Sequence, residues 1–413
     1  MTTPVIAGAL SGVRVLDLSR VLAGPWATQI LADLGADVLK VEHPVRGDDT
    51  RAWGPPFLTL PDGSDDGAES AYYLAANRNK RSAAIDFARP EGAALIRRLA
   101  AKADILVENY KVGGLAKYEL DYAAIFAINP RIVYCSISGF GQDGPYAQRG
   151  GYDFIAQGMG GFMSVTGEAG GQPLRAGVAI ADLSTGNYAA TAILAALRHA
   201  ERTGHGQHID ISLLDTQIAM MANLGSSYLV SGQAARPTGN RHPTLVPYTT
   251  FAVADGTVII AVGNDRQFRA LCDALGMPAM ADDPRFLRSR DRVANRAACE
   301  AEVARLVADR TKAQLAALFD PVGVPVGPIN DLAEVFADPF VAARGTVHRF
   351  EREDGVAVPS VAYPAKLSRT PASFRQMPPR IGEHTAELLD EWLELAPGEF
   401  AALAAAGAVR QRS

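Results

Sequence analysis

The chain has 413 residues, 48% of them hydrophobic and 21% charged, and its formal net charge is −5. This length favours two domains, and the composition is that of an ordinary globular protein with no indication of nucleic acid or an acidic membrane surface as a partner. The most apolar helical stretch, Tyr188 to Leu197, is far shorter than a membrane span. Three isolated cysteines (Cys135, Cys272 and Cys299) argue against a disulfide framework or a metal site, and the N-terminus lacks the basic segment of a signal peptide. These features favour a cytoplasmic protein.

The first part of the chain alternates between strand and helix patterns. Val13–Leu18 is predicted to be a strand, Pro25 suits the first turn of a helix that ends near Gly35, and Asp37–Glu42 is the next strand. The alternation continues with strands over Ser82–Phe87, Asp104–Tyr110 and Ile132–Ser138, and with a helix that begins at Pro90. Strands that alternate with helices predict an α/β fold with a parallel sheet covered on both faces.

The first turn between strand and helix resembles a dinucleotide-binding turn in position but not in sequence. It runs from Ser19 to Pro25 and lacks the G-x-G-x-x-G pattern. An NAD-dependent oxidoreductase is therefore disfavoured, although the sheet is Rossmann-like. The glycines at 158, 160 and 161 follow no strand at the required spacing and are interpreted as a turn.

The pattern changes after a helix predicted over about 214–232. A polar connection leads to a hairpin over Phe251–Ile260 with a turn at Asp255 and Gly256, and helices follow over 267–275 and 292–307. We predict a smaller α+β domain over 240–330. The tail contains an extended run over 357–363 and two helices over about 383–407.

Asp182 carries the strongest chemical signal. An apolar run from Ala176 ends at this carboxylate, and a helix follows directly. Free backbone N–H groups and the dipole at a helix N-terminus lower the pKa of a nearby carboxyl group, so Asp182 is expected to stay ionised and able to act as a nucleophile. The alternative is that it only caps the helix, with Ser184 and Thr185 as competing caps.

Several short motifs occur in a fixed order along the chain. They are DDTRAWGPPF from Asp48, NRNKRS from Asn77, VENY from Val107, YCSISGFGQ from Tyr134 and GEHT from Gly382. Together with the Asp182 segment, this series resembles the class III CoA-transferases from about residue 8 to 408. Within that family it is most similar to enzymes of the succinyl-CoA:glutarate type.

The resemblance implies a fold and a reaction. Asp182 would attack an acyl-CoA donor, form a mixed anhydride and then an aspartyl-CoA thioester, and pass CoA to a dicarboxylic acid, with CoA as substrate and no permanently bound cofactor. The Rossmann-like large domain would span 1–225 and be completed by 331–413. The protein would be an interlocked homodimer.

The resemblance also assigns a set of binding residues. Arg46 is expected to replace an arginine that many relatives carry at His43. The residues expected to bind CoA are Leu22, Ala23, His43, Arg46, Ile85, Asp86, Arg89, Asn109, Tyr110, Lys111, Lys117, Ser138, Gly139 and Phe140. Alternatively, Lys111 and Lys117 lie on a solvated surface.

Other side chains are candidates for roles outside CoA binding. Trp53 either gates the site or packs in the core. The cations of the segment 77–81 either cradle a phosphate or lie in a solvated loop. A dicarboxylic acid keeps one free carboxylate when its other end is esterified, and a buried carboxylate needs a cation as partner. Arg51 is favoured for this role over Arg20 and Arg175.

Two alternatives come from other reactions. An α-methylacyl-CoA racemase needs two acid–base groups on either side of one carbon, and relatives of that kind carry a histidine where this chain has Tyr152. A catalytically silent CoA-binding protein is disfavoured by the presence of Asp182.

Overall fold

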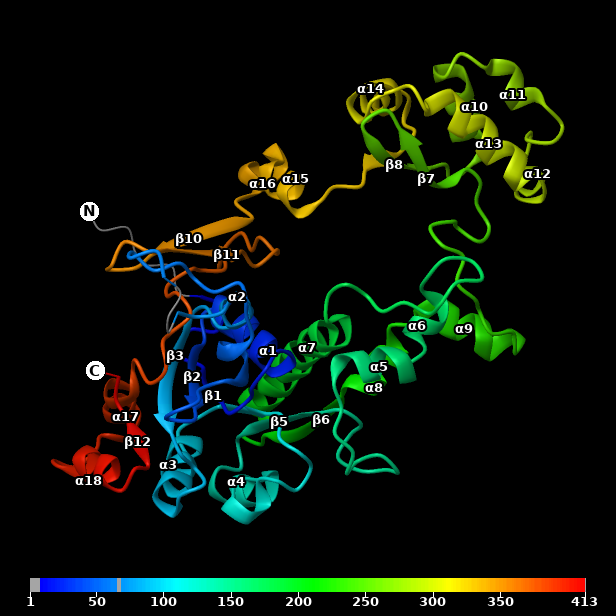
Figure 1. Ribbon diagram of the computed structural model, residues 1–413. Helices are drawn as coiled ribbons and strands as arrows, with labels where there is room; N and C mark the ends of the chain where they lie inside the picture. The colour runs from blue at the N-terminus through cyan, green and yellow to red at the C-terminus, as the bar shows by residue number, and fades with distance from the viewer. Residues whose placement is uncertain (1–7, 65–67, 413) are drawn as a thin grey trace. The chain divides into compact units, whose positions relative to one another are not determined.

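The computed structural model describes residues 8–64 and 68–412 (Figure 1). The chain divides into two compact units. The first comprises residues up to 162 with 175–232 and from 342 onward, and the second comprises 163–174 and 233–341. The second unit differs from the predicted range 240–330, because it extends from 233 to 341 and also takes in the segment 163–174.

The first unit is built on a seven-stranded sheet with the order β12-β3-β2-β1-β4-β5-β6. The neighbouring pairs from β3 to β6 are parallel, and only β12 at the β3 edge is antiparallel. This order confirms the Rossmann-like α/β prediction. Successive strands are added on one side of β1 as far as β3 and then, from β4 onward, on its other side, and sheets of this kind bind ligands at this switch point, beyond the carboxyl ends of the strands. The strands are β1 (Arg14–Asp17), β2 (Asp37–Glu42), β3 (Lys80–Ile85), β4 (Ile105–Glu108), β5 (Val133–Ser138), β6 (Gln207–Ser212) and β12 (Val409–Arg410).

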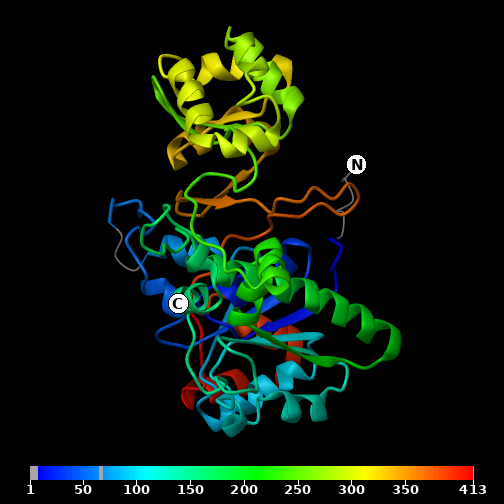
Figure 2. The ribbon, with the colours of Figure 1, turned by 90° about the vertical axis from the view of Figure 1, so that its right-hand side faces the viewer.

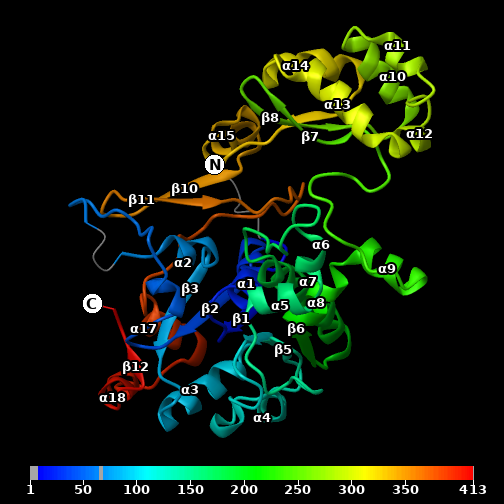
Figure 3. The same cartoon turned by 45° about the vertical axis from the view of Figure 1, so that its right-hand side comes forward.

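Helices cover both faces of this sheet (Figures 2 and 3). One face packs against α1 (Ala23–Asp33) and α7 (Ile180–Thr203), the long green helix in Figure 2. The other packs against α3 (Pro90–Ala100), α4 (Tyr122–Ile128), α17 (Thr385–Leu393) and α18 (Glu399–Ala405). Successive strand residues serve opposite faces, so Val15 belongs to the first core and Leu16 to the second.

Shorter elements complete the first unit. The predicted helix over 214–232 is interrupted by a turn at Met220 and Met221, and Ala222, which begins the second of the two helices, has a positive φ of 42°. The extended tail segment is paired in an antiparallel hairpin that packs on the helix containing Tyr73. These elements are η1 (Asp49–Ala52), α2 (Ala71–Ala75), η2 (Ala116–Tyr118), α5 (Asp153–Met159), α8 (Leu213–Ala219), α9 (Ala222–Ser231), β10 (Val347–Glu351) and β11 (Ala357–Val361), while α6 (Phe162–Val165) and α16 (Pro339–Arg344) lie at the unit boundaries.

The second unit is a small α+β body around a three-stranded antiparallel sheet of β7 (Tyr248–Val253), β8 (Gly256–Ala261) and β9 (Val326–Pro328). The predicted hairpin is confirmed, but its turn lies one residue earlier, at Ala254 and Asp255, because Gly256, at a φ of 143°, already pairs with Val253. The helices are α10 (Asp265–Ala274), α11 (Pro278–Asp282), α12 (Ser289–Ala294), α13 (Arg296–Val307), α14 (Lys312–Phe319), η3 (Asp320–Val322) and α15 (Leu332–Ala337). No helix within residues 8–64 and 68–412 has both the length and the apolar character needed to cross a bilayer.

Candidate active site

The first turn after β1 is held in a strained conformation at the carboxyl edge of the sheet. Val21 has a φ of 70°, which is rare for a β-branched residue. Arg20, beside it, is clamped by Asn109 from the loop after β4, whose side-chain oxygen accepts the Arg20 N–H at 2.9 Å and whose amide donates to the Arg20 carbonyl at 2.6 Å. The loops that follow β1 and β4 are therefore fixed to each other.

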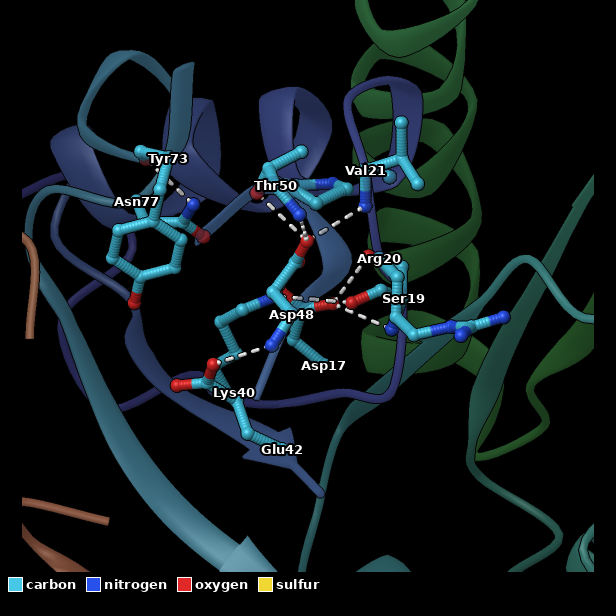
Figure 4. A network of polar contacts seen from close by, with 12 residues as sticks. Asp17, Ser19, Arg20, Val21, Lys40, Glu42, Asp48, Thr50, Tyr73 and Asn77 are labelled. Carbon is cyan, nitrogen blue, oxygen red and sulfur yellow. Dashed lines mark hydrogen bonds and ion pairs between the residues drawn. The ribbon is translucent and has the colours of Figure 1, made fainter. Parts of the chain in front are cut away.

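A buried ion network supports this turn from below (Figure 4). Lys40, at the centre of β2, donates to the Ser19 carbonyl at 3.0 Å and to the Asp48 carboxylate at 2.8 Å. The other Asp48 oxygen accepts the N–H groups of Val21 and Thr50. Burial tends to lower the pKa of Lys40, but its carboxylate neighbours outweigh burial and raise it, while Lys40 holds the pKa of Asp48 at about 2 against the effect of burial.

Arg51 belongs to the same network rather than to a cavity wall. Its Nε and Nη2 atoms each donate to Glu42 at 2.7 Å, and its guanidinium lies 3.7 Å from the centre of the Tyr73 ring. A further bond reaches the carbonyl of Pro379. Arg51 thus joins β2 to the C-terminal tail, and it lines neither of the cavities described below.

Two adjoining cavities open above the carboxyl ends of the strands. The Asp182 cavity, of about 280 Å³, contains Asp182, and the His43 cavity, of about 270 Å³, contains His43. Arg20, Asp49 and Tyr110 line both. The other predicted residues in the Asp182 cavity are Leu22, Ala23, Asn109, Lys111, Ser138 and Gly139, and those in the His43 cavity are Arg46, Ile85, Asp86 and Lys117.

Several predicted residues lie outside these walls. Phe140 packs edge-on against Tyr146, and Arg89 lies 3.5 Å from Asp86. Trp53 is 43% exposed and packs edge-on against Tyr72 rather than in the core.

Sequence reasoning also missed part of the wall and misplaced one group of cations. Arg149 and Tyr152 line the Asp182 cavity. No role was predicted for Arg149, and Tyr152 was considered only as the replacement of a racemase histidine. Arg78, Lys80 and Arg81 neither cradle a phosphate nor lie in a solvated loop. They form ion pairs with Asp33, Asp17 and Asp37 respectively.

Asp182 is the third residue of α7. The N-cap residue of this helix is Ala179, whose side chain makes no hydrogen bond to the first N–H groups. Instead, one oxygen of Asp153 accepts the N–H groups of Ala181 at 2.8 Å and of Asp182 at 3.2 Å. Burial, together with the Asp153 carboxylate, raises the pKa of Asp182 to about 7. The expected lowering of this pKa is therefore wrong, because burial and the Asp153 charge oppose ionisation, and Asp153 also accepts the N–H groups of Ala181 and Asp182.

The raised pKa gives a stability prediction. Asp182 is deprotonated above pH 3.8 when unfolded but only above about 7 when folded, so wild type loses stability as the pH rises between these values. We expect Asp182→Asn to unfold at a higher temperature than wild type at about pH 8 and at nearly the same temperature at about pH 4. Thermal unfolding followed by circular dichroism across this range tests it, and a difference that does not change with pH would contradict it.

The described residues, 8–64 and 68–412, hold no group of three or more His, Cys, Asp and Glu side chains placed to bind a metal ion. The cysteines Cys135, Cys272 and Cys299 are free and buried. The two cavities are lined by a carboxylate of raised pKa, a set of cations and polar loop groups at the switch point of the sheet.

Comparison with known proteins gives a consistent result. The family model for CoA-transferase family III matches residues 10–385. A succinate–glutarate CoA-transferase of Agrobacterium fabrum is 52% identical over 92% of this chain and 95% of its own length, and the human succinyl-CoA:glutarate CoA-transferase is 42% identical over 97% and 90%. A crystal structure of a CaiB/BaiF family protein from Brucella suis, 47% identical, covers 94% of this chain and 100% of that one with a TM-score of 0.85. The chain belongs to CoA-transferase family III, and it is a CoA-transferase.

Proposed function

We propose that this CoA-transferase moves CoA from succinyl-CoA to a dicarboxylic acid of the glutarate type, with Asp182 as the nucleophile. The observation that carries the proposal is the position of Asp182 in the wall of a cavity that also contains the turn after β1 and the loops after β4 and β5. The names of the relatives from Agrobacterium fabrum and human support the choice of substrates.

The proposed reaction conserves the energy of the thioester. The Asp182 carboxylate attacks the carbonyl of succinyl-CoA and expels CoA thiolate, which leaves a mixed anhydride. The thiolate then attacks the aspartyl carbonyl, which releases succinate and leaves an aspartyl-CoA thioester. The acceptor acid repeats the steps in reverse. Both intermediates hydrolyse readily, so the site must exclude water.

We assign the two cavities to the two ends of CoA. His43, Arg46 and Lys117 give the His43 cavity cationic or protonatable groups suited to phosphates, and Phe87 and Tyr118 give it apolar ring surface. The thioester end would then pass Tyr110, which lines both cavities, and reach Asp182.

Arg20 is our candidate for the second carboxylate of the substrate, in place of Arg51. It lines the Asp182 cavity, its side chain is 40% exposed, and its buried Nε atom has no hydrogen-bond partner. We expect Arg20→Met to raise the KM for glutarate by about ten- to a hundredfold, as the loss of a charge-assisted contact does.

Two comparisons make the Arg20 test specific. The KM for a monocarboxylate such as butyrate should change little in Arg20→Met. The matched variant Arg175→Met, which removes an exposed arginine that stacks on Phe154, should leave the KM for glutarate unchanged. Equal effects on glutarate and butyrate would overturn the assignment of Arg20.

The test of the function itself is a product analysis. The protein is incubated with succinyl-CoA and a panel of dicarboxylic acids, and the CoA esters are resolved by mass spectrometry. Appearance of a new dicarboxylyl-CoA together with succinate supports the proposal. Deuterium incorporation from D₂O next to the thioester carbonyl of a 2-methylacyl-CoA, without transfer, would instead support the racemase alternative.

We also propose that the protein is a homodimer. The helices α5, α8 and α9 are in contact in series and expose large apolar side chains, which monomeric proteins rarely gather in one patch. These side chains are Tyr152, Phe154, Ile218, Tyr228, Leu229 and Val230, with Val230 90% exposed. Sedimentation at micromolar concentration should give a dimer, Leu229→Glu together with Val230→Glu should weaken it, and a wild-type monomer would contradict the proposal.

A further inference from the structure

Asp153 is the first residue of α5, and three hydrogen bonds fix its carboxylate. One oxygen accepts the N–H groups of Ala181 and Asp182, and the other accepts the side-chain amide of Gln157 at 2.6 Å. Gln157 is itself fully buried and is oriented by the N–H group of Ala176, which donates to its side-chain oxygen at 2.8 Å. Asp153 is therefore rigidly placed beside the first turn of α7.

The hydrogen bonds at the N-terminus of α7 differ from those that are usual at a helix N-terminus. The first N–H groups of a helix ordinarily stabilise a bound anion or a carboxylate in the first turn. Here the two nearest N–H groups are taken by one carboxylate, and a second carboxylate, Asp182, stands beside it. Helix capping alone does not require an aspartate at this position, since a serine or asparagine accepts the same N–H groups without a charge.

The electrostatic surroundings identify Asp153 as the group that acts on Asp182. Burial raises the pKa of Asp182, and Asp153 is the charge that raises it further. Burial, followed by the charges of Asp182 and Asp153, also raises the pKa of Tyr72 in α2 to about 12. The other charged side chains in the wall of the Asp182 cavity are Arg20, Asp49, Lys111 and Arg149.

We propose that Asp153 is a positioning residue: its negative charge, held at the start of α7 by the two N–H groups that it takes up, makes the Asp182 carboxylate a poorer leaving group than the carboxylate of the substrate. This inference rests on the proposed function, because it concerns which of the two carbonyl carbons of the mixed anhydride is attacked by CoA thiolate.

The anhydride has two carbonyl carbons that CoA thiolate can attack. Attack on the acyl carbonyl breaks its bond to the Asp182 oxygen, returns the electron pair to Asp182 and regenerates acyl-CoA. Attack on the aspartyl carbonyl breaks the bond between that carbon and the same bridging oxygen, which leaves with the electron pair as the substrate carboxylate, and CoA remains on Asp182 as a thioester. No proton is consumed in either direction, and the less basic carboxylate leaves more readily.

The same argument applies at equilibrium. Free enzyme and acyl-CoA exchange with enzyme-bound CoA thioester and free acid. Asp153 destabilises the Asp182 anion, whereas the thioester carries no charge at that position. The covalent enzyme is therefore favoured, and each unit by which the Asp182 pKa falls should lower its equilibrium constant about tenfold.

The experiment compares wild type with Asp153→Asn, in which an amide oxygen still accepts the helix N–H groups but the charge is gone. Intact-mass spectrometry measures the fraction of enzyme carrying CoA at a fixed ratio of succinyl-CoA to succinate, without an acceptor. We expect that fraction to correspond to an equilibrium constant at least about tenfold lower in Asp153→Asn, and the rise of kcat/KM with pH to move to lower pH by about a unit or more.

The controls separate this inference from the function it rests on. Asp104→Asn removes a carboxylate that also accepts a backbone N–H, that of Arg14 at the start of β1, and it should leave both readouts unchanged. If Asp153→Asn does not fold, Asp153→Ser provides an uncharged cap and gives the same expectation. Equal adduct fractions and pH profiles in wild type and Asp153→Asn overturn the role of Asp153. Absence of any adduct in wild type overturns the proposed function instead.

Discussion

Asp182→Asn lowers the rate of CoA transfer by a factor of about 10³ or more, because the amide cannot form the anhydride on which the proposed reaction depends. The substitution keeps the size of the side chain. The Asp182 N–H bond to Asp153 is a backbone contact and is retained. We therefore expect CoA to bind with little change in affinity, since the walls of both cavities remain. Steady-state rates with succinyl-CoA and glutarate, together with calorimetric titration of CoA, measure the two effects separately.

A covalent readout makes this prediction independent of the rate assay. Wild type incubated with succinyl-CoA and then treated with hydroxylamine or borohydride should be modified at Asp182, and the asparagine variant should not. Asp104→Asn, directly before β4, serves as the matched control and should retain full activity and modification. Near-normal turnover by Asp182→Asn would exclude Asp182 as the nucleophile.

The strands of the large sheet were predictable because their signals are local. The predicted strand Asp37–Glu42 has the same bounds as β2, and the helix that was predicted to begin at Pro90 begins there in the structure, as α3. The edge strand β12 was missed because it has only two residues and pairs with Ile85 and Ala84 far away in the sequence. A contact between segments so distant leaves no periodicity in either of them.

The candidate site was predictable as a list of positions but not in its electrostatics. The family resemblance assigned Asp182 and a set of CoA-binding residues, and the walls of the two cavities contain most of them. The pKa of Asp182 was predicted in the wrong direction, because it depends on burial and on the charge of Asp153, which comes from a different helix. Sequence patterns report which groups are charged but not which partners neutralise them.

The same reason explains the arginine that was favoured for the substrate. Arg51 and Glu42 are nine residues apart, with neither a helical nor a strand spacing between them, so their ion pair was not visible in the sequence. A basic residue inside a family motif was taken as a ligand contact, whereas the structure uses it to tie β2 to the tail at Pro379.

The second large effect concerns the buried ion network under the turn after β1. Lys40 and Asp48 are fully buried and 2.8 Å apart, and Lys40 also donates to the Ser19 carbonyl. Lys40→Met keeps the apolar stem but leaves Asp48 without its cation, and removing one partner of a buried ion pair costs about 3–5 kcal/mol. We expect a corresponding fall in the free energy of unfolding measured by urea denaturation at neutral pH.

The pH dependence distinguishes loss of the ion pair from loss of packing. Lys40 holds the pKa of Asp48 near 2, below its ordinary 3.8, so the stability that this pair contributes is present above 3.8 and is lost as the pH falls toward 2. The gap between wild type and Lys40→Met should therefore be widest at neutral pH and narrow in acid. Lys102→Met, at an exposed position after α3, should change stability by less than about 0.5 kcal/mol. A gap that stays constant from neutral to acidic pH would mean that Lys40 acts through its packing, because only an ionised Asp48 requires the charge on Lys40.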